Sequence, residues 1–223
     1  MARNRSCLYE QYVWEVPVRA THWVNMLAII VLSVTGFYIG SPKTLGLDAS
    51  DFVMGWVRVV HFTAGYAFAV SVFSRIYWAF FGGNRYAGWR EFTPFLHPEG
   101  RRDMGRMFLY YTFLSRKLPH PVGHNALAGA TYLLVFLLYL AMAATGFALY
   151  AEHAPGGVMH KLLTPLYWLF TNQGMRLTHH MGMWLLIGFA IHHIYSAWLM
   201  DVKERGGVMS SVFGGYKPVK REE

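Results

Sequence analysis

Four stretches of the chain consist almost entirely of apolar residues, and the charged residues are concentrated between them. The stretches cover residues 22–40, 56–81, 125–150 and 178–200. Each is near the ~20 residues that an α-helix needs to cross the hydrocarbon layer of a membrane. Their ends are rich in the aromatic residues that gather at membrane–water interfaces, namely Trp14, Trp23, Trp56, Tyr77, Trp78 and Trp198. The pattern predicts an integral membrane protein with four transmembrane helices.

Two connections between the predicted spans contain shorter apolar segments. Residues 100–118 combine Arg and Lys with apolar residues at helical spacing, which predicts an amphipathic helix lying on the membrane surface; the apolar set is Met104, Met107, Phe108 and Tyr111. In connection 151–177, the segment LLTPLYWLF is too short to span. We expect Pro165 to break it and the segment to lie on the membrane or against a partner.

The basic residues give the orientation of the spans. Most Lys and Arg residues lie in the N-terminal segment, in connection 82–124 and in the C-terminal tail, whereas the opposite side has only Lys43, Arg58, Lys161 and Arg176. Because cytoplasmic loops carry an excess of Lys and Arg, both termini are predicted to be cytoplasmic. The formal charge of +8 therefore reports topology and does not predict a nucleic-acid partner.

The composition limits the chemistry that the chain supports. Only 14% of residues are charged and 54% are hydrophobic, whereas soluble domains average about 25% charged residues. The single cysteine, Cys7, excludes an intrachain disulfide, a self-contained iron–sulfur site and a Cys-x-x-Cys-His haem attachment. Any haem would therefore be held non-covalently. No internal repeat is recognised.

Histidines are unusually frequent within the predicted spans. A single histidine in a span is often only hydrogen-bonded inside a bundle, but ionisable groups at this depth are costly and tend to mark function. Here the spans contain His22, His61, His179, His180, His192 and His193. So many histidines in three of the spans predict a bound metal or cofactor.

The spacing of the histidines groups them into two levels. His179 and His193 are fourteen residues apart, which is within ~40° of whole helical turns and a rise of ~21 Å. Both rings therefore point to one side of the fourth helix, near opposite membrane faces. Chain direction then places His61 with His179 at the outer level and His22 with His193 at the inner level.

His180 and His192 are the competing candidates. Pairing His179 with His192, or His180 with His193, uses thirteen residues and leaves the two rings ~140° apart on the helix. We expect His180 and His192 to meet neighbouring helices, the interface or a partner instead.

Two further residues follow the same fourteen-residue spacing. Gly36 comes fourteen residues after His22, and Arg75 fourteen residues after His61. Gly36 would leave space for a flat macrocycle at the outer level, and Arg75 would pair with a haem propionate at the inner level. The alternatives are that Gly36 only packs helices and that Arg75 snorkels to the interface.

Haem fits these pairs better than zinc or copper does. A structural zinc site usually has four protein ligands, whereas each level offers two histidines from opposing helices. Two imidazoles fill both axial positions of a haem, which suits electron transfer rather than substrate chemistry. The sequence thus predicts an all-α membrane four-helix bundle that binds two haems b, with no catalytic residue of its own.

Several long motifs occur in order along nearly the whole chain. They are VPVRATHW, RVVHFTAGY, RIYWAFFGGNRY, GHNALAG, TGFALYAEH and HHMGMWLLIGFAIHHIYSAW. With them the chain resembles the b-type cytochrome subunits of membrane-bound nickel–iron uptake hydrogenases, and more widely the cytochrome b subunits of formate dehydrogenases and bacterial cytochrome b561-like proteins. In that family the ligand positions of the fourth span match His179 and His193. A basic residue is common where this chain has His180.

The resemblance implies a role as well as a fold. Residues 1–223 would form one transmembrane cytochrome b domain in the bacterial inner membrane, anchoring the small (iron–sulfur) and large (nickel–iron) hydrogenase subunits. Electrons from hydrogen would pass through the outer haem at His61 and His179 and the inner haem at His22 and His193 to a membrane quinone.

Two alternatives to this role are open. One is the same cytochrome serving another dehydrogenase, such as formate dehydrogenase. The other is a haem-free membrane scaffold or metal transporter. The nearly uniform apolarity of the third span speaks against a transporter, because a transporter needs a continuous polar path.

Overall fold

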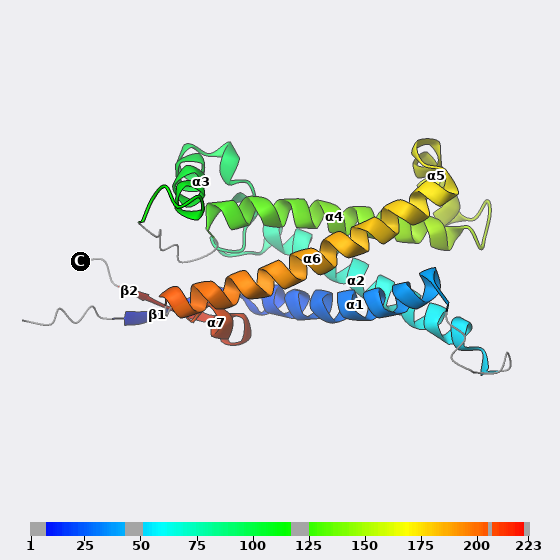
Figure 1. The fold of residues 1–223 in the computed structure, drawn as a ribbon, viewed down its shortest axis with the longest axis horizontal. Coiled ribbons are helices and arrows are strands. Elements are labelled where there is room, and N and C mark those ends of the chain that lie inside the picture. The colour runs from blue at the N-terminus through cyan, green and yellow to red at the C-terminus, as the bar shows by residue number, and fades with distance from the viewer. Residues whose placement is uncertain (1–7, 43–50, 117–124, 205–206, 221–223) are drawn as a thin grey trace, which may run out of the picture. The chain divides into compact units, whose positions relative to one another are not determined.

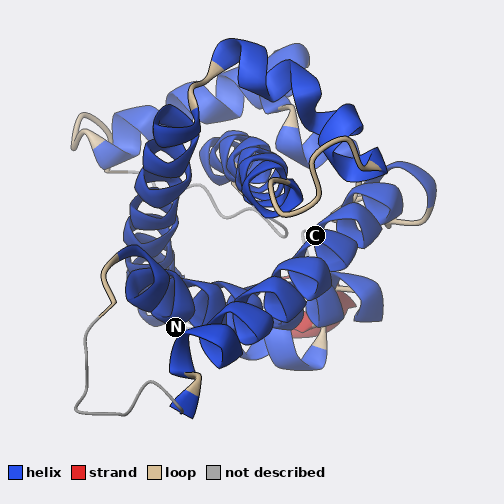
Figure 2. Ribbon diagram, turned by 90° about the vertical axis from the view of Figure 1, so that its right-hand side faces the viewer, coloured by secondary structure: helices blue, strands red, loops and turns tan. Residues whose placement is uncertain are grey.

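The computed structural model describes residues 8–42, 51–116, 125–204 and 207–220, which are predominantly helical (Figure 2). Four long helices dominate: α1 (Val16–Gly40), α2 (Val53–Phe81), α4 (Ala126–Ala151) and α6 (Asn172–Glu204). All four are long and apolar enough to cross a membrane, which confirms the predicted all-α class with four candidate spans. Outside the described residues lie Cys7 and the basic residues Arg3, Arg5, Lys43, Lys117, Arg205 and Arg221.

Shorter elements lie in the connections and before and after the long helices (Figure 1). Along the described chain these are β1 (Leu8–Tyr12), the 3₁₀ helices η2 (Trp89–Phe92) and η3 (Pro94–Leu96), α3 (Pro98–Tyr111), α5 (Val158–Leu169), α7 (Val208–Gly214) and β2 (Tyr216–Lys220).

The sequence explains where the long helices begin and end. Pro17 lies in the first turn of α1, where its missing N–H has no intrahelical partner to lose. α2 ends before two glycines, and the amides of Gly82 and Gly83 both donate to the Trp78 carbonyl, at 3.1 and 2.6 Å. α4 contains neither proline nor a charged residue, so nothing interrupts its backbone hydrogen bonds within the membrane.

The prediction for α5 was wrong in one respect, because the helix continues through Pro165. Pro165 removes only the hydrogen bond that its own amide would make to the Lys161 carbonyl. The ends of the helix are closed normally, with Lys161 N–H donating to Gly157 O at 2.9 Å and Phe170 N–H donating to Leu166 O at 2.9 Å. One missing bond in this exposed helix therefore does not break it.

The chain divides into two compact units, and each long helix contributes residues to both. Unit 1 comprises residues 1–21, 74–134 and 191–223, and unit 2 comprises residues 22–73 and 135–190.

Unit 2 is built from parts of the four long helices, together with α5. Each long helix contacts two others, in the cyclic order α1, α2, α4, α6. Gly182 allows α6 to approach α4 closely, because a Cβ atom there would overlap the Met142 thioether; small residues serve the same purpose at many membrane helix contacts. One contact between each pair of neighbouring helices illustrates this order: Thr35–His61, Phe62–Tyr150, Thr145–His179 and Phe37–Trp184.

Unit 1 joins the two ends of the chain, which the sequence did not predict. β1 and β2 lie side by side (Figure 1). They pair antiparallel, with Tyr12 opposite Tyr216. The amides of Val13 and Trp14 then donate to Gly215 O at 2.8 and 3.1 Å, and Gly215 itself has φ +87°. Since that conformation favours glycine, Gly215 ends α7 and starts the returning strand.

Candidate functional site

His61, in α2, is held by a threonine of the neighbouring helix α1. Its Nδ1 atom lies 2.8 Å from Thr35 Oγ1. The same hydroxyl lies 2.6 Å from the backbone carbonyl oxygen of Val31, one turn earlier in α1. The ring of His61 is therefore fixed through Nδ1, and Nε2 is the nitrogen that can bind a metal.

His179, in α6, is held in the same way by α4. Its Nδ1 atom lies 2.9 Å from Thr145 Oγ1, and that hydroxyl donates to the Ala141 carbonyl at 2.7 Å. Both histidines of the predicted outer level thus belong to unit 2, and each presents Nε2 as its possible metal-binding atom.

Glycines adjoin both rings. A Cβ atom on Gly36 would lie 3.5 Å from His61 Cε1 and 3.6 Å from the sulfur of Met183. Met183 is one turn after His179 on α6, so Gly36 is bordered by His61 and by the turn that follows His179. A Cβ atom on Gly146 would lie only 3.0 Å from His179 Cε1.

Sequence reasoning identified the two histidines and Gly36 but missed Thr35, Thr145 and Gly146. A short repeat could have revealed them. The tripeptide Thr-Gly-Phe occurs at residues 35–37 in α1 and again at residues 145–147 in α4. In both copies the threonine bonds a histidine of a neighbouring helix and the glycine adjoins the same ring.

The two competing histidines have other surroundings. His180 packs edge-on against Phe37 of α1, with ring centroids 6.3 Å apart, and lies 6.5 Å from the Trp184 ring. His192 is exposed, with its Nε2 atom 3.5 Å from Ser196 Oγ. These positions match the expectation that His180 meets a neighbouring helix.

The histidines of the predicted inner level fall in different units. His193 belongs to unit 1, where its Nδ1 atom lies 3.4 Å from the Tyr132 hydroxyl. His22 belongs to unit 2, where its ring lies edge-on to that of Trp23 with a centroid distance of 5.3 Å. The pairing of His22 with His193 stays a prediction.

Arg75, in unit 1, is buried, with 6% of its surface exposed. Its Nη2 atom donates to Ala87 O at 3.0 Å, and its guanidinium lies over the Phe92 ring at 5.1 Å. Nη1 is buried and has no hydrogen-bond partner among the described residues, and none of their carboxylates lies within ion-pair distance of Arg75. A buried N–H without an acceptor is costly, so this atom favours an anionic group at this position.

The motif GGNRY forms the loop that supplies the Ala87 carbonyl. Asn84 Oδ1 accepts from the Ala87 amide at 3.1 Å, and Asn84 Nδ2 donates to Val13 O at 3.1 Å. The Glu15 carboxylate accepts from the Asn84 amide at 2.9 Å and from Trp78 Nε1 at 2.8 Å. The loop after α2 is therefore tied to the segment before α1, and this tie places the acceptor for Arg75.

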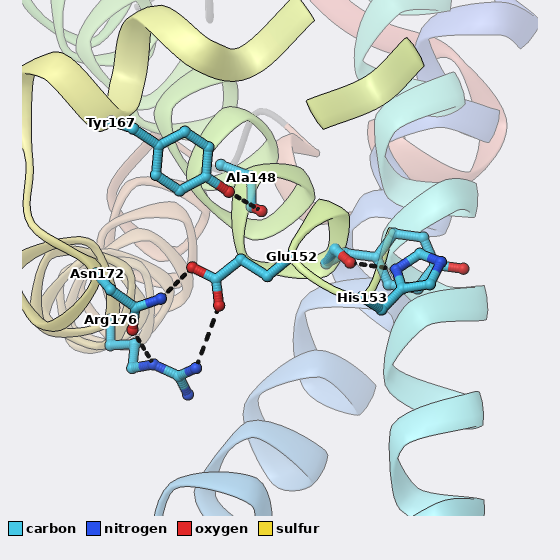
Figure 3. A network of polar contacts seen from close by, with 7 residues as sticks. Ala148, Glu152, His153, Tyr167, Asn172 and Arg176 are labelled. Carbon is cyan, nitrogen blue, oxygen red and sulfur yellow. Dashed lines mark hydrogen bonds and ion pairs between the residues drawn. The ribbon is translucent and has the colours of Figure 1, made fainter. Parts of the chain in front are cut away.

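A polar network joins α4, α5 and α6 in unit 2 (Figure 3). The Tyr167 hydroxyl donates to Ala148 O at 2.5 Å. The Glu152 carboxylate accepts from the Asn172 side chain and lies 3.5 Å from Arg176 Nη2. Partial burial and the nearby Glu152 carboxylate raise the pKa of Tyr167. The network fixes the start of α6 two turns before His179.

Among the described residues, no three His, Cys, Asp or Glu side chains form a group that could hold a metal ion. The two outer histidines instead offer one nitrogen each, from helices that lie opposite in the cyclic order of unit 2. Four apolar helices long enough to cross a membrane, two of which present histidines in this way, are typical of a membrane cytochrome, a class in which imidazoles bind haem.

Comparison with known proteins gives the family. Residues 13–215 match the family described as prokaryotic cytochrome b561, and the chain belongs to that family. Its relatives include a probable Ni/Fe-hydrogenase B-type cytochrome subunit from Cupriavidus necator, 40% identical over 94% of this chain and 87% of that protein. The probable Ni/Fe-hydrogenase 1 B-type cytochrome subunit of Escherichia coli K12 is 36% identical over 99% of this chain and 96% of that protein.

These findings confirm the resemblance that the motifs indicated. The protein is a membrane cytochrome b of the type found with Ni/Fe hydrogenases, and haem b is the cofactor that this class implies.

Proposed function

We propose that this protein is the electron-transfer subunit of a nickel–iron uptake hydrogenase, passing electrons from the hydrogenase small subunit to the membrane quinone. The observation that carries the proposal is the pair His61 and His179, each fixed through Nδ1 by a threonine of a neighbouring helix. The names of the relatives support the partner, since they are hydrogenase cytochrome subunits. Hydrogen itself is split by the large nickel–iron subunit.

At the outer level, His61 and His179 would hold one haem b. A haem held by two imidazoles would supply reversible one-electron chemistry. The protein's part is to hold the two rings from α2 and α6 and to keep a glycine beside each ring. Because Gly36 and Gly146 have no side chain, no Cβ atom occupies the position beside the His61 ring or the His179 ring.

At the inner level, His22 and His193 would ligate a second haem b. Arg75 supports an anionic group there, because its Nη1 atom is buried and lacks an acceptor among the described residues. A haem propionate would supply that acceptor and neutralise the buried charge. The low exposure of Arg75 speaks against the alternative in which its side chain extends to the membrane surface.

The orientation follows from the basic residues. Lys and Arg concentrate in the terminal segments and in connection 82–124, so these parts would face the cytoplasm and the protein would lie in the bacterial inner membrane. Residues 1–223 would then act as one cytochrome b domain, with the hydrogenase small and large subunits on the opposite face. Nucleic acid has no part in this function.

The test is a dithionite-reduced minus oxidised spectrum of the purified protein, with haem counted per chain. A b-type spectrum with about two haems per chain is expected, and the hydrogenase subunits should co-purify from the native membrane. Co-purification of formate dehydrogenase instead would replace the partner but keep the cytochrome. Folded protein without haem would overturn the proposal and favour a scaffold or transporter.

A further inference from the structure

In each of the two copies of Thr-Gly-Phe, the threonine holds a histidine of a neighbouring helix. In the first pair, Thr35 of α1 holds His61 of α2; in the second, Thr145 of α4 holds His179 of α6. The distances agree closely, at 2.8 and 2.9 Å to the histidine and 2.6 and 2.7 Å to the backbone carbonyl one turn back. All of these residues belong to unit 2.

Each threonine hydroxyl has one proton and two close partners, with a second backbone carbonyl farther away at 3.3 Å. A carbonyl oxygen can only accept, so the hydroxyl donates its proton to Val31 O or Ala141 O. The hydroxyl oxygen must then accept from the imidazole, which places a proton on Nδ1 of His61 and of His179. The neutral ring then has its in-plane lone pair on Nε2, and this tautomer can bind a metal through that atom.

We propose that Thr35 and Thr145 are positioning residues that fix the tautomer and orientation of the outer histidines and thereby tune the reduction potential of the outer haem. The inference rests on the proposed function, since it takes His61 and His179 as haem ligands. It goes beyond that function by assigning a role to two hydroxyls that act through His61 and His179.

The direction of the effect follows from the hydrogen-bond chain. A hydroxyl whose proton is already donated to a carbonyl is a stronger acceptor, and a ligand histidine that donates to such a group is a more basic ligand. A more basic imidazole stabilises ferric iron more than ferrous iron. Removing the hydroxyl should therefore raise the potential of the outer haem and leave that of the inner haem unchanged.

Threonines in membrane helices often bond back to a carbonyl one turn earlier without any further role. Thr131 is an example in the same helix as Thr145: its hydroxyl donates to Leu127 O at 3.0 Å. It is thus a matched control for the loss of a hydroxyl from α4 without the loss of a histidine contact.

The experiment compares Thr35→Val and Thr145→Val with Thr35→Ser, Thr145→Ser and Thr131→Val in the purified cytochrome–hydrogenase complex. Valine keeps the shape of threonine and removes the hydroxyl, whereas serine keeps the hydroxyl. The readouts are haem per chain, an optical redox titration, and the ferric low-spin EPR signal, which responds to the orientation of the axial rings.

We expect each valine variant to shift one of two potentials upward and to change one EPR signal, while both serine variants and Thr131→Val behave like the parent. If valine instead removes the outer haem and serine restores it, the proposal also stands, because the hydroxyl is then required to present the ring.

Unchanged potentials in valine variants that retain both haems would overturn the inference, and so would a haem loss that serine does not reverse. The proposed function would survive either result, since it is tested by the haem content of the parent protein. A parent protein without haem would defeat the proposed function before any variant is compared.

Discussion

His179 and His193 lie on one helix, yet they have different partners. In unit 2, His179 Nδ1 lies 2.9 Å from a hydroxyl whose own proton is directed at a carbonyl. In unit 1, His193 Nδ1 lies 3.4 Å from the Tyr132 phenol, which is near the outer limit of a hydrogen bond. If both histidines bind haem, the outer ligand contacts a threonine hydroxyl through Nδ1, whereas the inner ligand contacts a phenol hydroxyl through the same atom.

The two units also differ in contacts that join their segments. In unit 2, the helices meet through aromatic pairs and small residues within the spans, as between Phe62 and Tyr150. In unit 1, polar groups from the chain ends and loops make the ties, as in the bonds of Glu15 to Asn84 and Trp78. The first kind of packing depends on residues within the apolar runs, and the second depends on contacts far apart in the sequence.

The largest expected effect comes from removing a ligand at one level. His179→Ala should remove the outer haem and His193→Ala the inner one, so that each variant holds about one haem per chain instead of about two. Haem content and a redox titration measure this. The exposed neighbour His192→Ala is the control and should retain both haems. Two intact haems in His193→Ala would disprove the pairing of levels.

Replacing Arg75 tests the inner level without touching a ligand. Arg75→Leu should lower the potential of the inner haem, because a nearby positive charge stabilises the reduced form. Two charges about 10 Å apart at an effective dielectric of about 20 interact by about 1.7 kcal/mol. Arg75→Lys retains the positive charge, so the reduction potential of the inner haem should stay close to that of the parent protein. The control is the exposed Arg85→Leu, and equal potentials in Arg75→Leu and the parent would exclude Arg75 from the haem environment.

The sequence predicted the spans because apolarity reports the membrane crossing directly. The last residues of α1, α2 and α4 lie at or within one residue of the predicted ends. α6 instead runs from Asn172 to Glu204, beyond the predicted 178–200, because a helix continues where the chain leaves the hydrocarbon layer. The amphipathic helix predicted within 100–118 is observed as α3, Pro98–Tyr111. Its placement on the membrane surface stays a prediction.

The candidate site was predicted only in part. Spacing along one helix is sufficient to relate His179 to His193, because helical geometry is regular. Thr35 and Thr145 contact histidines of neighbouring helices, so spacing within a span does not reveal them. The tripeptide Thr-Gly-Phe, which occurs in both helices, is a pattern that would have indicated them. The pairing of β1 with β2 joins opposite ends of the chain, and no local pattern specifies that register.

Gly215 offers a test of the ties that hold unit 1. Gly215→Ala would place a Cβ atom 2.7 Å from the Trp14 carbonyl at a residue with φ +87°, so we expect a loss of about 1–3 kcal/mol of stability. The neighbour Gly214 is the matched control, because a Cβ atom there meets nothing within 4 Å and its φ is not positive. Thermal unfolding measures the difference. Equal midpoints for the two variants would show that the joined chain ends contribute little to stability.

The smallest expected effect concerns pH, again in unit 1. Burial raises the pKa of Glu91 above its ordinary 4.5, with Arg85 acting in the opposite direction. The folded protein therefore binds this proton more tightly than the unfolded chain does, so the free energy of unfolding falls as the pH rises from about 4.5 through the raised pKa. Glu91→Gln should remove that decline and be more stable than the parent at neutral pH, with the difference shrinking in acid. Unfolding midpoints across this pH range measure the difference in stability between Glu91→Gln and the parent. The exposed Glu99→Gln is the control. Parallel pH profiles for Glu91→Gln and the parent would mean that burial of the Glu91 carboxyl does not influence folding.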